Sequence, residues 1–185
     1  GNLTMSERYS SQSAYHELYE KVIHNRQISL LGHDFVLIID DLISYNNHDY
    51  SQLFHLFPNA ILNVDGLKVS GIGSREDQII TIHQIIDDGL KINTRIGNES
   101  KIPSFCSEEY EKLIPCYTVS YEKSGASVRF ITLLEIGKVD ESLEIALREN
   151  ELEIVSSKGN YIIELQELSQ ADFPKRISPP IKKVD

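Results

Sequence analysis

Residues 22–42 read VIHNRQISLLGHDFVLIIDDL and carry a clear β-strand pattern. Apolar and polar residues alternate through much of residues 22–31, and a mainly aliphatic run follows the turn residues Gly32-His33-Asp34. Alternation with a period of two predicts a half-buried β-strand, and a glycine-containing turn between two such runs predicts a β-hairpin. We therefore expect two antiparallel strands that meet at Gly32.

The rest of the chain repeats this pattern, with short β-branched runs separated by turn pairs such as Asp65-Gly66 and Asp88-Gly89. Glycine and asparagine accept the positive φ that hairpin turns need. About a dozen strands at this spacing predict an all-β fold, a large antiparallel two-layer β-sandwich. The best helical candidate is one turn at 107–113, SEEYEKL, capped by Ser107. The expected strands are 14–31, 35–43, 50–57, 60–64, 67–71, 78–86, 89–96, 117–123, 127–135, 142–147, 151–155 and 160–167.

The length of 185 residues suits one domain with a core of its own. We expect a flexible N-terminal lead at 1–13, the sandwich at 14–168 and a tail rich in proline and lysine at 169–185. The chain begins with Gly, and its only methionine is Met5, so we expect either a tag remnant at its start or a segment cut from a longer polypeptide.

The composition excludes several classes of partner. A net charge of −10 argues against nucleic acid. No apolar run approaches the roughly 18–20 residues that a membrane-spanning helix needs.

Cys106 and Cys116 are too few for a disulfide framework, so we expect two free thiols, with one disulfide as the alternative in an exported protein.

Polar residues interrupt three apolar strand faces around the opening stretch. In a strand, residues two apart share a face, so His24 lies with Arg26, Asp40 follows a run of aliphatic residues, and His55 lies between Leu53 and Phe57. Polar groups buried on such faces need partners. A meander of the three strands would place Asp40 opposite His24 or Arg26, with His55 on its other side.

Two interpretations of this group remain open. Two histidines and an aspartate on adjacent strands can ligate zinc, with water or a substrate oxygen as the fourth ligand. Alternatively, Arg26 and Asp40 form an ion pair, and the histidines are hydrogen-bonded within the sandwich. Whether Asp40 or Asp41 points toward this group is also open, because a one-residue slip of register exchanges the two.

The stretch at 15–58 resembles the β-sandwich domain of the heparinase II/III-like polysaccharide lyases. The family pattern is a His-x-Arg strand, a hydrophobic strand that ends in Asp and a strand with an aromatic residue before a His. Here these elements are 24–26, 36–40 and 54–56. The stretch SFCSEEYEKLIPCYTVSYEKSGASVRFITLLEI, 104–136, resembles a later part of the same domain. The matching residues there are Ser107, Tyr110, Pro115 and Thr132-Leu133-Leu134.

The resemblance implies a function in a larger protein. Such lyases, which are bacterial, cleave uronic-acid polysaccharides such as glycosaminoglycans by β-elimination, and most of their catalytic residues come from an (α/α) toroid. This chain shows no helices for a toroid. We therefore expect a non-catalytic scaffold that forms one wall of the cleft for an acidic polysaccharide, with no catalytic residue of its own and no activity alone. A periplasmic or secreted location is also implied.

The resemblance further implies a structural zinc ion held by His24, Asp40 and His55. Arg26 and Arg75 are the residues expected to bind the substrate, because a guanidinium pairs with carboxylate or sulfate groups. The alternative is a non-catalytic carbohydrate-binding module, which an exposed aromatic platform on one sheet face would favour. A metal-dependent jelly-roll enzyme is disfavoured, because the sequence has no His-x-His.

Overall fold

The structure, a computed structural model, describes residues 2–5, 9–19, 22–75, 78–97, 104–166 and 181–184. In residues 1–21 and 181–185, side chains are described only for Gln12 and Ala14. Strands and turns account for nearly all of the described backbone, so the expected all-β sandwich is confirmed. No helix among these residues could cross a membrane.

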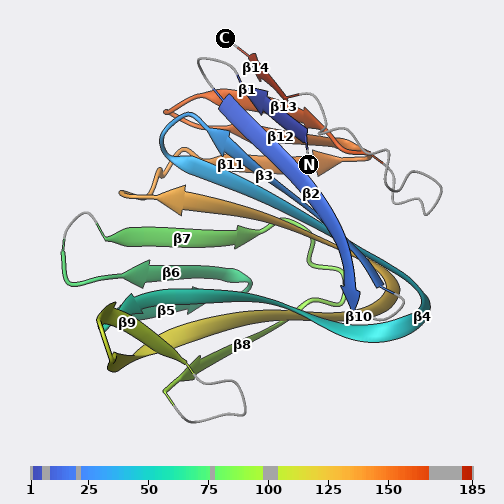
Figure 1. Cartoon of the computed structure of the whole chain (residues 1–185). Coiled ribbons are helices and arrows are strands. Elements are labelled where there is room, and N and C mark those ends of the chain that lie inside the picture. Colours follow the sequence, from blue (N-terminus) through green and yellow to red (C-terminus); the bar gives the residue numbers. More distant parts are fainter. Residues whose placement is uncertain are drawn as a thin grey trace.

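The described residues form fourteen strands in two antiparallel sheets (Figure 1). The larger sheet has the order β1-β2-β3-β4-β10-β7-β6-β5, with β8 and β9 also paired to β10, and the smaller has the order β11-β12-β13-β14. The strands are β1 (Asn2–Met5), β2 (Tyr9–Tyr19), β3 (Val22–Leu31), β4 (Phe35–Pro58), β5 (Ile61–Asp65), β6 (Lys68–Ile72), β7 (Ile79–Gln84), β8 (Lys91–Ile96), β9 (Phe105–Glu109), β10 (Lys112–Ile136), β11 (Glu144–Arg148), β12 (Glu151–Val155), β13 (Asn160–Glu164) and β14 (Ile181–Val184).

Two long strands, β4 and β10, pair with each other over most of their lengths and form the backbone of the molecule. The sequence predicted two strands, 35–43 and 50–57, in place of β4, and two strands, 117–123 and 127–135, in place of β10. Both divisions were wrong. The polar residues between them do not end the ladder, because Asp49 pairs with Ser124 and His48 pairs with Gly125.

The β4–β10 ribbon bends where its register shifts, between Gly125 and Ser127. Figure 1 shows β4 turning back on itself at this end of the molecule. The first half of β4 pairs with β3, and the matching half of β10 pairs with β7, whereas the other half of β10 pairs with β8. The bend stacks one half of the ribbon over the other, and this fold-back positions the site described below.

The fold-back encloses one hydrophobic core. Leu42 and Phe130 from the first half of the ribbon cluster with Tyr50 and Tyr121 from the second half. Tyr121 is fully buried, donates a hydrogen bond to the Leu67 carbonyl oxygen at 2.9 Å, and meets the Phe54 ring edge-on. Aromatic side chains therefore fill much of the space between the stacked halves.

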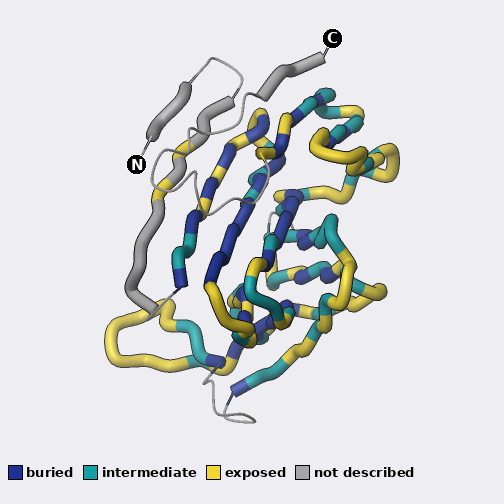
Figure 2. The backbone as a smooth tube through the Cα atoms, turned by 90° about the vertical axis from the view of Figure 1, so that its right-hand side faces the viewer, coloured by how far each residue is buried: buried dark blue, intermediate teal, exposed yellow. Residues whose placement is uncertain are grey.

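The opposite face of the first half carries a second core, which the smaller sheet covers. Leu37 and Leu133 of the ribbon pack with Leu152 and Ile163 of β12 and β13, and all four are fully buried. Figure 2 shows the resulting runs of buried residues along the central strands. Both faces of this half are thus covered, which explains the continuous burial of residues 39–44.

A buried carboxylate also links the loops of the smaller sheet to the larger one. Glu135 of β10 is inaccessible to solvent, lies 3.3 Å from Nε2 of His83, and accepts a 2.5 Å hydrogen bond from the Asp140 N–H. Lys158, in the turn between β12 and β13, lies 3.5 Å from Asp34 and 3.8 Å from Glu135. These polar contacts satisfy a charge that would otherwise be costly to bury.

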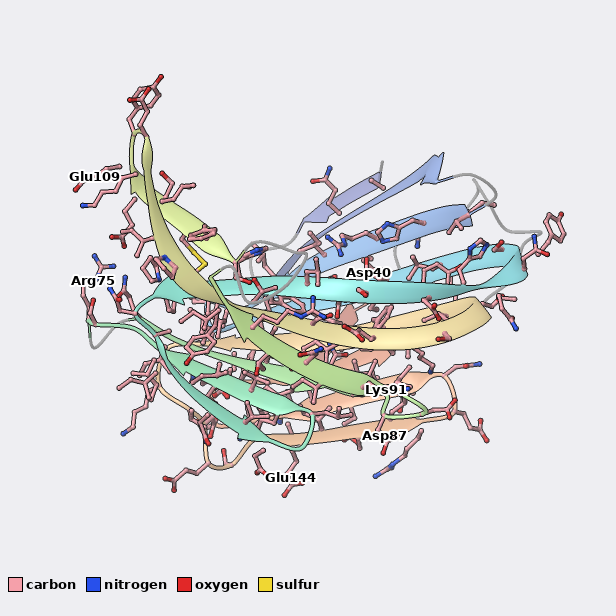
Figure 3. All side chains as sticks on the ribbon, turned by 90° about the horizontal axis from the view of Figure 1, so that it is seen from below. Asp40, Arg75, Asp87, Lys91, Glu109 and Glu144 are labelled. Atoms are coloured by element: carbon pink, nitrogen blue, oxygen red, sulfur yellow. A yellow bond between two sulfur atoms is a disulfide. The ribbon has the colours of Figure 1, made fainter. Side chains whose placement is uncertain are left out.

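Residues 107–113 form a β-hairpin, so the expected helical turn was wrong. Glu109 ends β9, Lys112 begins β10, and a disulfide between Cys106 and Cys116 joins the two strands, with a Cα–Cα distance of 5.9 Å. The expectation of two free thiols was therefore wrong, and the alternative of one disulfide is the one observed. Pairing with the long strand β10 outweighs the local preference for a capped turn. The hairpin, on which Glu109 is labelled, projects from the body in Figure 3.

The expected terminal segments also contain strands. Residues 2–5 and 9–13 of the N-terminal lead belong to β1 and β2, and residues 181–184 of the tail form β14 beside β13. Residues 167–180 lie outside the described part of the chain.

Candidate functional site

The candidate site is a pocket of about 670 Å³ at the mouth of the fold-back. β3 and both halves of β4 contribute to its walls. Its polar lining includes His24, Arg26, Asp40, His48, Tyr50 and Gln52. Residues far apart along one strand therefore share one concave surface.

The register of β3 and β4 determines which side chains face the pocket. Arg26 lies directly opposite Asp40, and His24 lies opposite Leu42. Residues opposite each other in an antiparallel pair share a face, so all four side chains are on the side enclosed by the fold-back. The intervening residue Asp41 therefore faces the other way, which settles the choice between Asp40 and Asp41 that the sequence left open.

Asp40 is the centre of the site, and only 2% of its side chain is exposed. Its Oδ1 accepts a hydrogen bond from Arg26 Nε at 2.6 Å and lies 2.9 Å from His24 Nε2. Its Oδ2 accepts from Arg26 Nη2 at 2.8 Å and from Gln52 Nε2 at 2.9 Å. The guanidinium thus holds both carboxylate oxygens, which is the strongest geometry for such a pair.

These contacts keep Asp40 ionised despite its burial. Burial alone raises the pKa of a carboxyl group, but the hydrogen bonds from His24 and Arg26, together with the charge of Arg26, outweigh it and lower the pKa of Asp40 from 3.8 to about 2. Arg26 benefits in return, because its hydrogen bond to Asp40 raises the guanidinium pKa. The pair is therefore charged at any physiological pH.

A chain of side-chain hydrogen bonds continues from Asp40 into the protein. Gln52 Oε1 accepts from the Thr132 hydroxyl and from Gln84 Nε2, both at 2.8 Å, and Gln84 Nε2 also lies 2.8 Å from Thr132 Oγ1. Three strands, β4, β7 and β10, contribute to this chain. It holds Gln52, on the second half of the ribbon, against Asp40 and Thr132 on the first half.

His48 and Tyr50 form the wall nearest the bend. His48 Nε2 lies 3.0 Å from the Ser44 hydroxyl, and its ring centroid is 5.9 Å from that of Tyr50. The Tyr50 hydroxyl is buried and has no hydrogen-bond partner among the described residues. Burial raises the pKa of Tyr50, so this hydroxyl is a neutral donor and acceptor.

The structure brings together His24 and Asp40, two of the three expected zinc ligands, and separates the third. His55 is exposed and alternates along β4 with the inward residues Phe54 and Leu56, so it faces away from the pocket. It lies opposite Thr118 of β10. No group of three His, Cys, Asp or Glu side chains suited to a metal occurs among the described residues.

The expected ligands therefore do not fit a three-residue zinc site. The sequence placed His55 beside Asp40 because it treated 50–57 as a separate strand of a meander. In one continuous strand the fold-back brings Gln52, and not His55, to Asp40. Whether the protein holds zinc stays a prediction that metal analysis has to test.

The two arginines expected to bind substrate also lie apart. Arg26 lines the pocket, with 46% of its side chain exposed. Arg75 lies between β6 and β7, in a turn where its carbonyl oxygen accepts a 3.0 Å hydrogen bond from the Gln78 N–H. Figure 3 shows Arg75 at one end of the molecule, well away from Asp40. Only Arg26 belongs to the candidate site.

Sequence reasoning missed Gln52, Gln84 and His48. One signal was available for Gln52, because it shares a strand face with Tyr50, Phe54 and Leu56, and a lone amide on an apolar face calls for a partner. The bend that brings this face over Asp40 has no comparable local signal.

Comparison with solved structures gives close matches in fold at low sequence identity. Heparan sulfate lyase HepC from Pedobacter heparinus matches with a TM-score of 0.71 and 15% identity over 89% of this chain. Two heparinase III structures match with TM-scores of 0.70 and 0.67, at 13% and 12% identity, each over 90% of this chain. No family model and no curated protein sequence matches.

This chain covers only 27% of the length of each of these three proteins. At such identities the likeness establishes a shared fold and no more. The chain has the fold of a β-domain that forms part of heparinase III lyases.

Proposed function

We propose that this chain is the β-sandwich domain of a heparinase-like polysaccharide lyase and forms one wall of a cleft for an acidic polysaccharide. The observation that carries the proposal is the match in fold to heparinase III over about nine-tenths of this chain and a quarter of the other. In this proposal the catalytic residues belong to the part of the lyase that this chain does not cover. We assign no catalytic residue within this chain.

The pocket at Asp40 supports a role in contacting the polysaccharide. It combines a half-exposed guanidinium with imidazole, amide and phenol groups, which can hydrogen-bond to sugar hydroxyl and carboxylate groups. The chain is acidic overall, with a net charge of −10, so a polyanion would need a local site of this kind. The disulfide between Cys106 and Cys116 supports an oxidising compartment, such as the periplasm or the exterior.

Titration with heparan sulfate oligosaccharides, followed by calorimetry, tests the binding role. We expect Arg26→Ala to weaken binding about tenfold, the effect of losing about 1.4 kcal/mol of contact energy. Arg75→Ala is the matched control, because it removes the same charge from a position outside the pocket. Equal losses in the two variants would indicate non-specific attraction, and a complete lack of binding by the wild type would contradict the role of the pocket.

An absorbance assay for unsaturated uronate products tests the non-catalytic assignment. We expect no product from heparin, heparan sulfate, hyaluronan or alginate with this chain alone. Product formation by the wild type that is lost in Asp40→Asn would show that the chain is itself catalytic.

The alternative, a carbohydrate-binding module with no lyase partner, gains no support from the exposed aromatic residues. Among the described side chains, the two strongly exposed tyrosines are Tyr45, near the bend of β4, and Tyr110, in the turn after β9. They lie on different elements and do not share a sheet face.

A further inference from the structure

The acceptor sites of Asp40 are already occupied by groups of the protein. A carboxylate offers about four lone-pair positions. In this structure Arg26 takes one position on each oxygen, Gln52 takes a second on Oδ2, and His24 Nε2 is 2.9 Å from Oδ1. A zinc ion bound to His24 and Asp40 would need a carboxylate oxygen at about 2.0–2.2 Å, and would have to displace at least one of these contacts.

The guanidinium is a poor neighbour for a metal ion. It cannot lose its proton, so its positive charge would remain beside the ion. Arg26 Nε is only 2.6 Å from the oxygen that faces His24. Like charges this close repel strongly where the surroundings are partly buried.

We infer that Arg26 occupies the place of the metal: its guanidinium is the resident cation of the His24–Asp40 pair, and this chain holds no zinc there. The fixed cation neutralises Asp40 and orients it without any bound ion. The pocket wall is then stable to chelators, whereas a zinc-dependent wall would lose folding energy with its metal. This inference does not depend on the proposed function.

A single substitution should convert the site. Position 26 is directly opposite Asp40 and on the same face as His24, two residues away on β3. Arg26→His removes the guanidinium and supplies a second imidazole, which gives two imidazoles and one carboxylate, a ligand set typical of zinc. Arg26→His is therefore expected to bind zinc, and the wild type is not.

The chain offers a matched control on the other face of β4, where Asp41 pairs with Arg129 of β10. Arg129 holds both oxygens of Asp41, with Nε–Oδ1 and Nη2–Oδ2 distances of 2.5 and 3.1 Å. Arg129→His breaks an equivalent pair, but at a carboxylate that faces away from His24. It controls for any general effect of replacing, by histidine, an arginine that pairs with a buried aspartate.

The experiment measures zinc content after equilibration with ZnCl₂ and removal of excess, together with the melting temperature with and without EDTA. We expect one zinc per chain in Arg26→His, lost in His24→Ala/Arg26→His, and affinity at least about tenfold above that of the wild type. Arg129→His should match the wild type, and EDTA should leave the wild-type melting temperature unchanged.

One zinc per wild-type chain that is lost in both His24→Ala and Asp40→Asn would overturn the inference. Failure of a folded Arg26→His variant to take up zinc more tightly than the wild type would overturn it as well. If Arg26→His does not fold, calorimetric titration of the wild type with ZnCl₂ decides. Zinc binding that depends on His24 contradicts the inference, and no such binding supports it.

Discussion

Asp40 and Asp41 are adjacent in the sequence, and only 2% of each side chain is exposed. In each, the two carboxylate oxygens accept hydrogen bonds from Nε and Nη2 of one arginine, yet the surroundings of the two pairs differ. The Arg26–Asp40 pair borders the pocket, and 46% of the arginine side chain is exposed. The Arg129–Asp41 pair lies on the opposite face, and only 12% of its arginine is exposed. The same chemistry thus provides an accessible cation on one face and an internal brace on the other.

The largest expected effect is on the internal pair. Arg129→Ala leaves the Asp41 carboxylate buried without its guanidinium, and breaking a buried pair in this way costs about 3–5 kcal/mol of folding free energy. Urea unfolding monitored by circular dichroism measures the loss. A loss below about 1 kcal/mol would show that water reaches Asp41 and that the two pairs do not differ as described.

The next effect is on acid stability. Because the pKa of Asp40 is lowered from 3.8 to about 2 in the folded protein, its contribution is present above pH 4 and is lost as the pH falls toward 2. The shift corresponds to about 2 kcal/mol. Unfolding free energies measured from pH 5 to pH 2 should therefore converge for the wild type and Asp40→Asn. Curves that stay parallel would contradict the lowered pKa.

Arg26→Ala should cost less than Arg129→Ala, about 1–2 kcal/mol, because Asp40 keeps its contacts to Gln52 and His24 and borders a pocket that water can enter. The same urea experiment gives the comparison directly. A loss as large as that of Arg129→Ala would mean that the pocket side is as dry as the internal side.

The smallest effect is expected at His24. His24→Ala removes one of several contacts to Asp40, and we expect a loss of about 1 kcal/mol or less. In a double-mutant cycle, His24→Ala and Arg26→Ala should not be additive, since both act on Oδ1 of Asp40. Additive losses would indicate that the two side chains stabilise the fold independently.

The local pattern predicted much of the fold. Alternation in 22–31 and the turn at Gly32 predicted the β3–β4 hairpin but left two registers open, with Asp40 opposite His24 or Arg26, and the structure has Arg26 opposite Asp40. Short-range chemistry of this kind acts within a few residues and can be seen in the sequence. The Arg26–Asp40 ion pair, one of the two interpretations left open, is present in the structure.

The fold-back of β4 could not be predicted in the same way. The sequence predicted separate strands at 35–43 and 50–57, whereas pairing with β10 continues one strand beyond the bend. This pairing joins residues far apart in the sequence, such as Gln52 and Tyr121, and the fold-back then brings Gln52 to Thr132, 80 positions away. Because 50–57 was treated as a separate strand, the sequence placed His55 beside Asp40, a position that Gln52 occupies in the structure.

The most direct test of the account compares the two arginines in solution. We would follow the side-chain Nε–H resonances of Arg26 and Arg129 by NMR during titration with a heparan sulfate oligosaccharide. We expect the Arg26 resonance to shift in proportion to occupancy while the Arg129 resonance stays in place. Equal shifts, or a shift of Arg129 alone, would contradict the assignment of the Asp40 pocket as the face that meets the polysaccharide.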